Sequence, residues 1–345
     1  RVRKFMKLFK SLLVAPATLG LLAPMSATAN EVTINDFNPA EELAVTNSRV
    51  DGLEARLNNF EAGSFSETTV ASFSVDAFIG SVDGDTTSEA TTFAYQYNIG
   101  LSSSIGEGFL DVAIDSGSDV ATTADDPMAY DTGAALSVDG VTYSFPVGGI
   151  SMVVGNDTDI SASFTGACSY SAFTDYMGDC GTGNSLGVGG NGVTATGSYA
   201  FDSGFSLAAG LSSETGDAVS SDGILTNEGL DTFGIEAAYT ADSWGLAVAY
   251  VSADGAEAAE TTSWGINGSY SFDLVDISVG VETQETGGTD SSGYFVGLTF
   301  PEVGPGSVSV GAATAGNFTD AQTELMTYEA SYSYPVNDNL TITPG

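Results

Sequence analysis

The chain has no positively charged side chain over most of its length. Its seven Lys and Arg residues all lie within the first 56 positions, and no His occurs anywhere. The 289 residues from Leu57 to Gly345 therefore hold 39 of the 45 acidic residues without a basic partner. Such carboxylates must stay in water or bind cations. Because the composition is 42% hydrophobic and 10% aromatic, it is too apolar for a disordered acidic tail, and we expect a fold that sorts its charge onto one side.

A secretory signal peptide is predicted at residues 1–29, including a short upstream extension before Met6. The expected parts follow in order, namely Lys7 and Lys10, an apolar run from Leu12 to Leu22, and the small-residue exit Ala27-Thr28-Ala29. The alternative is a transmembrane helix, but Pro and Gly interrupt a run that is shorter than the roughly 20 apolar residues a span needs. No later segment is apolar enough for a spanning helix, which leaves secreted, periplasmic or β-barrel membrane fates.

Residues 30–42 are interpreted as a linker and residues 43–62 as a coiled-coil helix. Apolar residues occupy most of the heptad seam, with Leu43, Val50 and Leu57 at a positions and Thr46, Leu53 and Phe60 at d positions. Three heptads with Gly52 inside would be weak as a free dimer. The alternatives are an amphipathic helix packed on a domain and, as we prefer, a coiled coil held together by a larger oligomer.

From residue 63 onward the hydrophobic period changes to two. Residues on alternate positions are large and apolar on one side and polar on the other, as in Trp264, Ile266 and Tyr270 against Asn267, Ser269 and Ser271. Strands with lipid outside and water inside have this dyad pattern. Residues 63–345 are therefore predicted to form an all-β, transmembrane antiparallel barrel.

Turn residues divide this region into fifteen expected strands. They cover residues 65–79, 91–104, 107–116, 134–145, 149–155, 191–201, 204–213, 231–240, 243–252, 261–272, 274–284, 291–300, 306–314, 324–334 and 338–344. Long connections alternate with short turns, as is typical of outer-membrane barrels. The long connections are residues 80–90, 117–133, 156–190, 214–230, 253–260, 285–290 and 315–323. Since bacterial barrels have even strand numbers, about sixteen strands are expected, with the last one missing from this carboxyl-terminally truncated sequence.

Aromatic residues gather beside the short turns. Examples are Phe145, Phe201, Trp244, Phe272, Phe300 and Tyr334. An aromatic girdle at a membrane interface is the preferred interpretation, and ordinary core aromatics are the alternative.

Alternation also predicts which acids face the inside of the barrel. These pore-lining candidates are Asp76, Asp111, Asp115, Glu236, Asp276, Glu282 and Glu329. The longest connection adds candidates for a constriction loop, namely Asp157, Asp159, Asp175 and Asp179, with solvated rim residues as the equal alternative. Together these acids predict a negative internal potential that concentrates cations.

Both cysteines of the chain lie in that longest connection. Cys168 and Cys180 in one loop of an exported protein most simply form a disulfide. A metal site is disfavoured, because two thiolates without any His make a poor zinc set. A loop stapled in this way is expected to fold into the lumen and narrow the pore.

Three segments resemble a known family. They are MKLFKSLLVAPATLGLLAP from Met6, RVDGLEARL from Arg49 and FSETT from Phe65. Here the chain resembles the cyanobacterial major outer-membrane porins, relatives of the carbohydrate-selective (OprB-like) porins that are often labelled iron-uptake porins. The resemblance implies a homotrimer of sixteen-stranded barrels in the cell outer membrane that passes small solutes and inorganic ions. The family's usual surface-layer-homology module is missing, since only residues 30–42 occupy its place, and peptidoglycan anchoring is therefore not expected.

The composition provides few residues suited to other classes of function. Without His or Lys in the barrel there is no conventional general base, so we expect no enzyme, no cofactor and no resident metal. Acidic loop pairs such as Asp83 with Asp85 are more consistent with solvated turns than with calcium sites. Nucleic acid is excluded as a partner by the negative charge. The competing hypothesis is a secreted, acidic β-rich surface or adhesive protein that binds divalent cations.

Overall fold

The computed structural model describes residues 47, 49–50, 68–81, 91–118, 133–188, 192–217, 222–254, 259–314, 316–319 and 324–345. The predicted signal peptide and linker lie outside these residues, as does most of the predicted coiled-coil helix, of which Asn47, Arg49 and Val50 are helical. The chain divides into two compact units, residues 1–67 and 68–345. Within the described ranges, no helix is both long and apolar enough to span a membrane.

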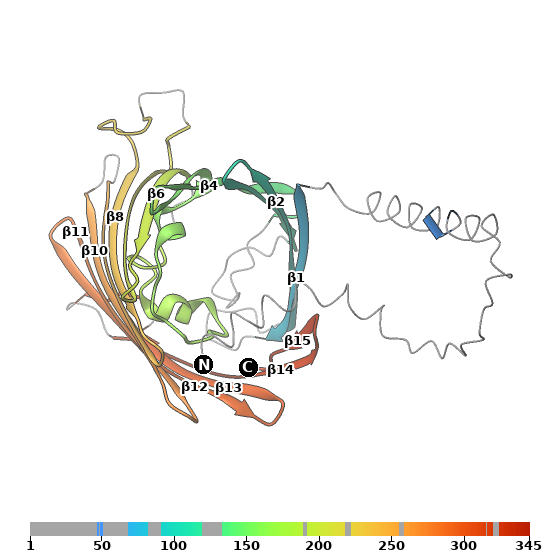
Figure 1. Cartoon of the computed structure of the whole chain (residues 1–345). Helices are drawn as coiled ribbons and strands as arrows, with labels where there is room; N and C mark the ends of the chain where they lie inside the picture. The colour runs from blue at the N-terminus through green and yellow to red at the C-terminus, as the bar shows by residue number, and fades with distance from the viewer. Residues whose placement is uncertain are drawn as a thin grey trace. The chain divides into compact units, whose positions relative to one another are not determined.

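The second unit is built on one antiparallel sheet of fifteen strands that pair in sequence order (Figure 1). The strands are β1 (Thr69–Ser81), β2 (Thr91–Ile105), β3 (Gly108–Gly117), β4 (Ser137–Val147), β5 (Ile150–Thr158), β6 (Gly192–Ala200), β7 (Phe205–Ser213), β8 (Asp231–Thr240), β9 (Trp244–Ala253), β10 (Thr261–Ser271), β11 (Asp276–Thr286), β12 (Thr289–Val303), β13 (Gly306–Thr314), β14 (Met326–Asn337) and β15 (Leu340–Ile342). All fifteen expected strands are present. β1 and β15 are the two ends of this order, and closure of the barrel stays a prediction.

One predicted long connection is wrong. Residues 285–290 were expected to form a loop between strands, but β11 continues to Thr286 and β12 begins at Thr289. Only Gly287 and Gly288 remain between them, with φ of 58° and 80°. Two glycines at positive φ form the tight hairpin turn that matches the twist of the flanking strands, so the polar residues around them join the ladder instead of a loop.

The burial of side chains on the strands is inverted relative to a soluble protein. On β10, Ile266 is 48% exposed whereas its neighbour Asn267 is 2% exposed. The same pattern recurs on other strands, where large apolar residues are exposed and Ser, Thr, Asn and Glu are buried; the buried polar residues include Thr196, Ser212, Glu236, Ser278, Glu282 and Ser309. The alternation predicted from the sequence therefore separates an apolar outer face from a polar inner face.

Aromatic rings pair on the outer face beside the short turns. Tyr199 lies 4.6 Å from Phe201, Tyr239 lies 5.0 Å from Trp244, and Tyr270 lies 4.5 Å from Phe272, each measured between ring centroids. These pairs come from the β6–β7, β8–β9 and β10–β11 turns, which lie at the same end of the antiparallel sheet. Each pair contains a Tyr or Trp, so rings that carry a polar atom occur along this rim.

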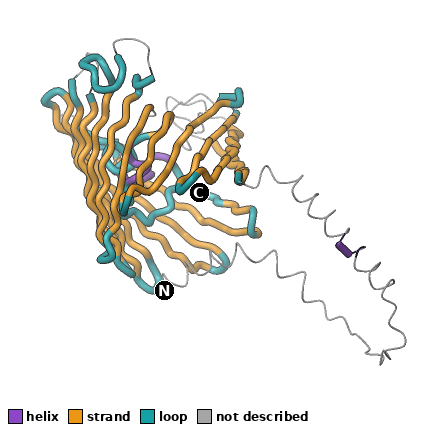
Figure 2. Tube along the Cα trace, turned by 45° about the horizontal axis from the view of Figure 1, so that its top comes forward, coloured by secondary structure: helices purple, strands orange, loops and turns teal. Residues whose placement is uncertain are grey.

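The connection between β5 and β6 folds against the inner face of the sheet. It contains two 3-10 helices, η2 (Ile160–Ser163) and η3 (Asp175–Gly181). In Figures 1 and 2 this connection lies inside the curved sheet, along β6 to β13, whereas β1 lies across from it. We call residues 159–188 the inward loop. Its position was expected from the sequence, and its contacts are described next.

Candidate functional site: the inward loop and the inner face

The inward loop begins with a capped turn and a buried isoleucine. The Asp159 carboxylate accepts a hydrogen bond of 2.6 Å from the Ser161 backbone N–H and caps η2. Ile160 is fully buried and packs in one cluster with Val188 and Val251. The first turn of the loop is thereby fixed to the inner side of the sheet.

Glu236 on β8 holds the next part of the loop. The Thr165 N–H donates to its two carboxylate oxygens at 2.9 and 2.8 Å, and the Gly166 N–H donates to Oε1 at 2.8 Å. Glu236 is only 3% exposed, because the loop covers it. Two backbone donors thus satisfy a carboxylate that has no basic residue near it.

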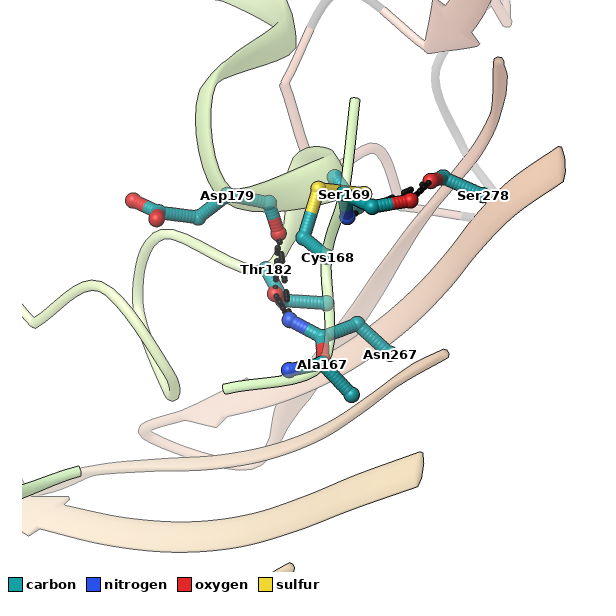
Figure 3. The surroundings of a disulfide bond; sticks show 8 residues. Ala167, Cys168, Ser169, Asp179, Thr182, Asn267 and Ser278 are labelled. Carbon is teal, nitrogen blue, oxygen red and sulfur yellow. Dashed lines mark hydrogen bonds between the residues drawn. A yellow bond between two sulfur atoms is a disulfide. The ribbon is translucent and has the colours of Figure 1, made fainter. Parts of the chain in front are cut away.

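Asn267 on β10 and Ser278 on β11 contact the middle of the loop (Figure 3). Asn267 Oδ1 accepts from the Ala167 N–H at 2.8 Å, and its Nδ2 donates to Thr182 Oγ1 at 3.1 Å. The Ser169 and Ser278 hydroxyl oxygens lie 2.9 Å apart. Asn267 therefore joins two arms of the loop, one before Cys168 and one after Cys180.

The two cysteines are joined in a disulfide between these arms. The Cα atoms of Cys168 and Cys180 lie 5.8 Å apart, and the bond closes a segment with a sequence separation of 12. Cys180 is fully buried and packs with Met177, Phe295 and Ala313. The disulfide therefore staples a part of the loop that is already packed on β12 and β13.

Glu329 on β14 accepts four hydrogen bonds from residues 170–174 of the inward loop. The donors are Tyr170 Oη and the Phe173 N–H to Oε1, both at 2.9 Å, and the Thr174 N–H and Oγ1 to Oε2 at 3.0 and 2.7 Å. Burial raises the pKa of Tyr170 far above its usual value, and the hydrogen bond and charge of Glu329 add to this. The phenol therefore remains a donor to the carboxylate.

Glu282 on β11 is the most deeply buried of the three glutamates, at 1% exposure. Its Oε1 accepts from Asn184 Nδ2 at 2.6 Å and from Asn317 Nδ2 at 3.0 Å. Its Oε2 accepts from Ser185 Oγ at 2.6 Å. Asn317 comes from the connection between β13 and β14, so a second segment also reaches this carboxylate.

These contacts change the role that we assign to three predicted pore-lining residues. Glu236, Glu282 and Glu329 face inward, where alternation places them, but the inward loop lies over them. Their carboxylates are used to accept hydrogen bonds from the loop and are not on open surface. Sequence alternation could not show this, since the donors are 35 to 159 residues away along the chain.

Three of the other four predicted pore-lining acids lie on β1 and β3, for which no hydrogen bond from the inward loop is described, and the fourth, Asp276, lies at the start of β11. Asp76 pairs with Gln96, Asp111 with Ser102 and Thr142, and Asp115 with Asn98 and Ser137, so all three have polar cross-strand neighbours. Ser137 Oγ donates to the Asp115 carboxylate at 2.9 Å. Asp276 is half-buried at the start of β11. Their lining of a pore stays a prediction.

Two of the predicted constriction acids, Asp175 and Asp159, act on a third, Asp179. Burial raises the pKa of Asp179, and the charges of Asp175 and then Asp159 raise it further. Asp179 also has a left-handed backbone with φ of 49°, and Thr182 Oγ1 donates to its carbonyl oxygen at 2.5 Å. Asp157 is exposed at the end of β5, also at positive φ. No group of three or more possible metal ligands is arranged to hold an ion in the part of the chain that the structure describes.

Sequence reasoning did not single out Asn267, Ser278, Tyr170 or Asn317. The available signal was weak, since Asn267 and Ser278 are two of several polar residues that alternate with apolar ones on β10 and β11. Their importance depends on a loop about 100 residues away, which the local pattern does not contain.

No protein-family model matches the chain, and no curated protein is significantly similar to it. Several solved porins are similar in structure. For the anion-selective porin from Comamonas acidovorans the TM-score is 0.58 at 14% identity, covering 78% of this chain and 85% of that one. For a porin refined at 1.8 Å the TM-score is 0.51 at 14% identity, covering 79% and 92%. A mutant porin of Rh. blastica has a TM-score of 0.46 at 16% identity, covering 80% and 91%. The chain therefore has a porin-like fold.

We predict that the disulfide stabilises the inward loop more than the sheet. Replacing both Cys168 and Cys180 by Ser removes the staple, and closing a loop of this length is worth about 3 kcal/mol. Hydrogen exchange of peptides from residues 165–188 should then rise about 100-fold. Peptides from β2 and β3 serve as the internal control and should be unchanged. Equal loss of protection in loop and sheet would contradict a local role.

Proposed function

We propose that this chain is an outer-membrane porin that allows passive diffusion of small hydrophilic solutes and inorganic ions. The observation that carries the proposal is the inverted burial of the strands, with apolar residues exposed and polar residues buried. Such a surface is stable when lipid lies outside and water inside. The aromatic pairs along the short-turn rim support the same orientation, because rings of this kind favour the membrane interface. The porin-like fold agrees with it.

We further propose that the pore prefers cations. One protein of similar fold is anion-selective by name, so the fold alone does not determine which ions pass. The preference must come from side chains, and this chain has no Lys, Arg or His after Arg56. Asp159, Asp175 and Asp179 would supply negative charge from the inward loop, and Asp76, Asp111 and Asp115 from β1 and β3 across the sheet. A field of one sign concentrates cations and repels anions.

Salt dependence follows from the same proposal. Screening lengths fall from about 8 Å at 0.15 M to about 3 Å at 1 M, so charges far from the ion path lose influence first. Selectivity that survives concentrated salt should depend on the loop aspartates.

The more specific assignments rest on the resemblance of residues 6–24, 49–57 and 65–69. It supports membership of the cyanobacterial porins and a homotrimer. The proposed cleaved signal peptide and the coiled coil at residues 43–62 rest instead on the charge, hydropathy and heptad patterns of those segments. The resemblance also favours inorganic ions and sugars as transported solutes.

A lysine substitution on the outer face tests whether the protein is a porin or a secreted surface protein. In a bilayer, Ile266→Lys should destabilise the folded chain by about 2–4 kcal/mol, because a charge near the membrane centre is costly. Leu274→Lys, on the exposed turn before β11, is the matched control and should change stability by less than about 0.5 kcal/mol. Denaturant unfolding in lipid vesicles measures both. If the two substitutions have the same small effect, the outer face does not contact lipid.

Gly187 allows a test of Asp179 that keeps every charge. A Cβ added at Gly187 would collide with the Asp179 carboxylate, whereas one added at Gly183 would meet nothing within 4 Å. In planar bilayers under a salt gradient, the unmodified protein should give a cation-selective reversal potential. Gly187→Ala should shift that potential toward zero, and Gly183→Ala should leave it unchanged. A zero or anion-selective potential for the unmodified protein would overturn cation preference.

The preference for cations should also depend on pH. Because burial and the neighbouring Asp175 and Asp159 charges raise the pKa of Asp179, this group takes up a proton at higher pH than an ordinary aspartate. Cation preference should therefore begin to fall, as the pH is lowered, at a higher pH than protonation of an ordinary aspartate would require. The Asp179→Asn variant should lack this first step. If both proteins give the same pH profile, Asp179 does not contribute to selectivity.

A further inference from the structure

We propose that Glu282 is a positioning residue that couples the inward loop to residues 316–319, which belong to the connection between β13 and β14. With this coupling, the docked position of each segment on the inner face depends on the docked position of the other. Its consequence for ion flow rests on the proposed porin function, but the coupling itself does not.

Glu282 is the meeting point of three donors from two separate segments. Asn184 and Ser185 belong to the inward loop and donate at 2.6 Å each. Asn317 belongs to the β13–β14 connection and donates at 3.0 Å to the same oxygen that Asn184 uses. One carboxylate oxygen therefore accepts a hydrogen bond from each segment.

The β13–β14 segment is itself attached to the sheet beside this carboxylate. Phe318 exchanges two backbone hydrogen bonds of 2.9 Å with Ser292 on β12, which continues the ladder beyond the end of β13. Its ring lies 6.5 Å from that of Tyr294. The backbone hydrogen bonds between Phe318 and β12 therefore hold the neighbouring Asn317 beside Glu282.

The coupling follows from the charge of the buried group. An ionised carboxylate can only accept hydrogen bonds, and leaving a buried one short of donors is costly. No basic residue occurs after Arg56, so the donors seen at Glu282 are neutral groups. If one segment withdraws its donor, the carboxylate is less well satisfied, and water that enters to replace the donor also reaches the other segment. Each segment therefore stabilises the docked position of the other.

Glu236 and Glu329 provide the contrast within the same protein. The donors to these two carboxylates belong to the inward loop, namely Thr165 and Gly166 for Glu236, and Tyr170, Phe173 and Thr174 for Glu329. They hold the loop to the strands. Glu282 differs because its hydrogen bonds cross from one connection to another.

Hydrogen exchange on the full chain, folded in detergent micelles, tests the coupling. Asn317→Ala should raise exchange of the peptide covering residues 182–188 about 10- to 150-fold, the factor that corresponds to about 1.5–3 kcal/mol for a hydrogen bond to a charged group. Asn184→Ala should raise exchange of residues 316–319 by a similar factor. Thr165→Ala, which keeps the backbone donor to Glu236, is the control and should change neither peptide. Effects confined to the substituted segment would overturn the proposal.

Two substitutions at Glu282 separate positioning from folding. Glu282→Gln keeps an oxygen that can accept from both asparagines, so protection of both segments should stay within about threefold of the unmodified protein. Glu282→Ala removes the acceptor, and in that background Asn317→Ala should have no further effect on residues 182–188. An additive effect would contradict coupling through this carboxylate.

Conductance of the same variants gives the functional consequence. In planar bilayers Asn317→Ala should increase open-channel current noise, whereas Glu282→Gln should not. If the unmodified protein forms no channel, the porin proposal fails while the exchange result still decides the coupling. If channels form and exchange shows no cross-effect, the coupling fails and the porin proposal stands.

Discussion

The arrangement of the inner face depends on buried carboxylates that accept hydrogen bonds from neutral donors. In most proteins a buried acid is compensated by Arg or Lys, but neither occurs in this chain after Arg56. Backbone N–H groups, hydroxyls and amides take this role at Glu236, Glu282 and Glu329. Because these donors lie on connections and not on neighbouring strands, satisfying the acids brings the inward loop onto the sheet. The lack of positive charge is therefore a cause of the loop's position as well as a feature of composition.

This constraint divides the acids into two groups with different effects. The three glutamates have their lone pairs occupied by oriented dipoles, which offset part of their field, and the loop separates them from open space. Asp157, Asp175 and Asp179 have exposed surface, and partial desolvation, followed by the charges of Asp175 and Asp159, raises the pKa of Asp179. Counting acids on the inner face thus overestimates the charge that an ion would meet. The loop aspartates carry more of the proposed selectivity than the strand glutamates.

Local pattern was sufficient for the strands and insufficient for the site. Period-two alternation is a property of each strand alone, so it predicted all fifteen strands and which way Glu282 faces. It failed at residues 285–290, where a run of polar residues was read as a loop although two glycines at positive φ form a tight turn. It could not show that Asn267 and Ser278 receive the loop, or that Asn317 reaches Glu282, because those contacts join distant segments. The cysteine pair was the one loop feature that sequence spacing could suggest.

The same reasoning explains why a shared fold leaves ion preference open. A porin-like sheet has an apolar outer face and a polar inner face. The outer face is apolar because it contacts lipid, whereas the inner face needs only to be hydrated. Polar residues of either sign satisfy the inner face, so its charge is free to differ between proteins of similar fold, one of which is an anion-selective porin. In this chain the choice is tied to loop docking, because replacing a buried glutamate by a basic residue would leave the loop N–H groups facing another donor. The negative inner face is therefore maintained by the packing of the loop, and a change of sign at Glu236 or Glu329 would require a different loop as well as a different charge.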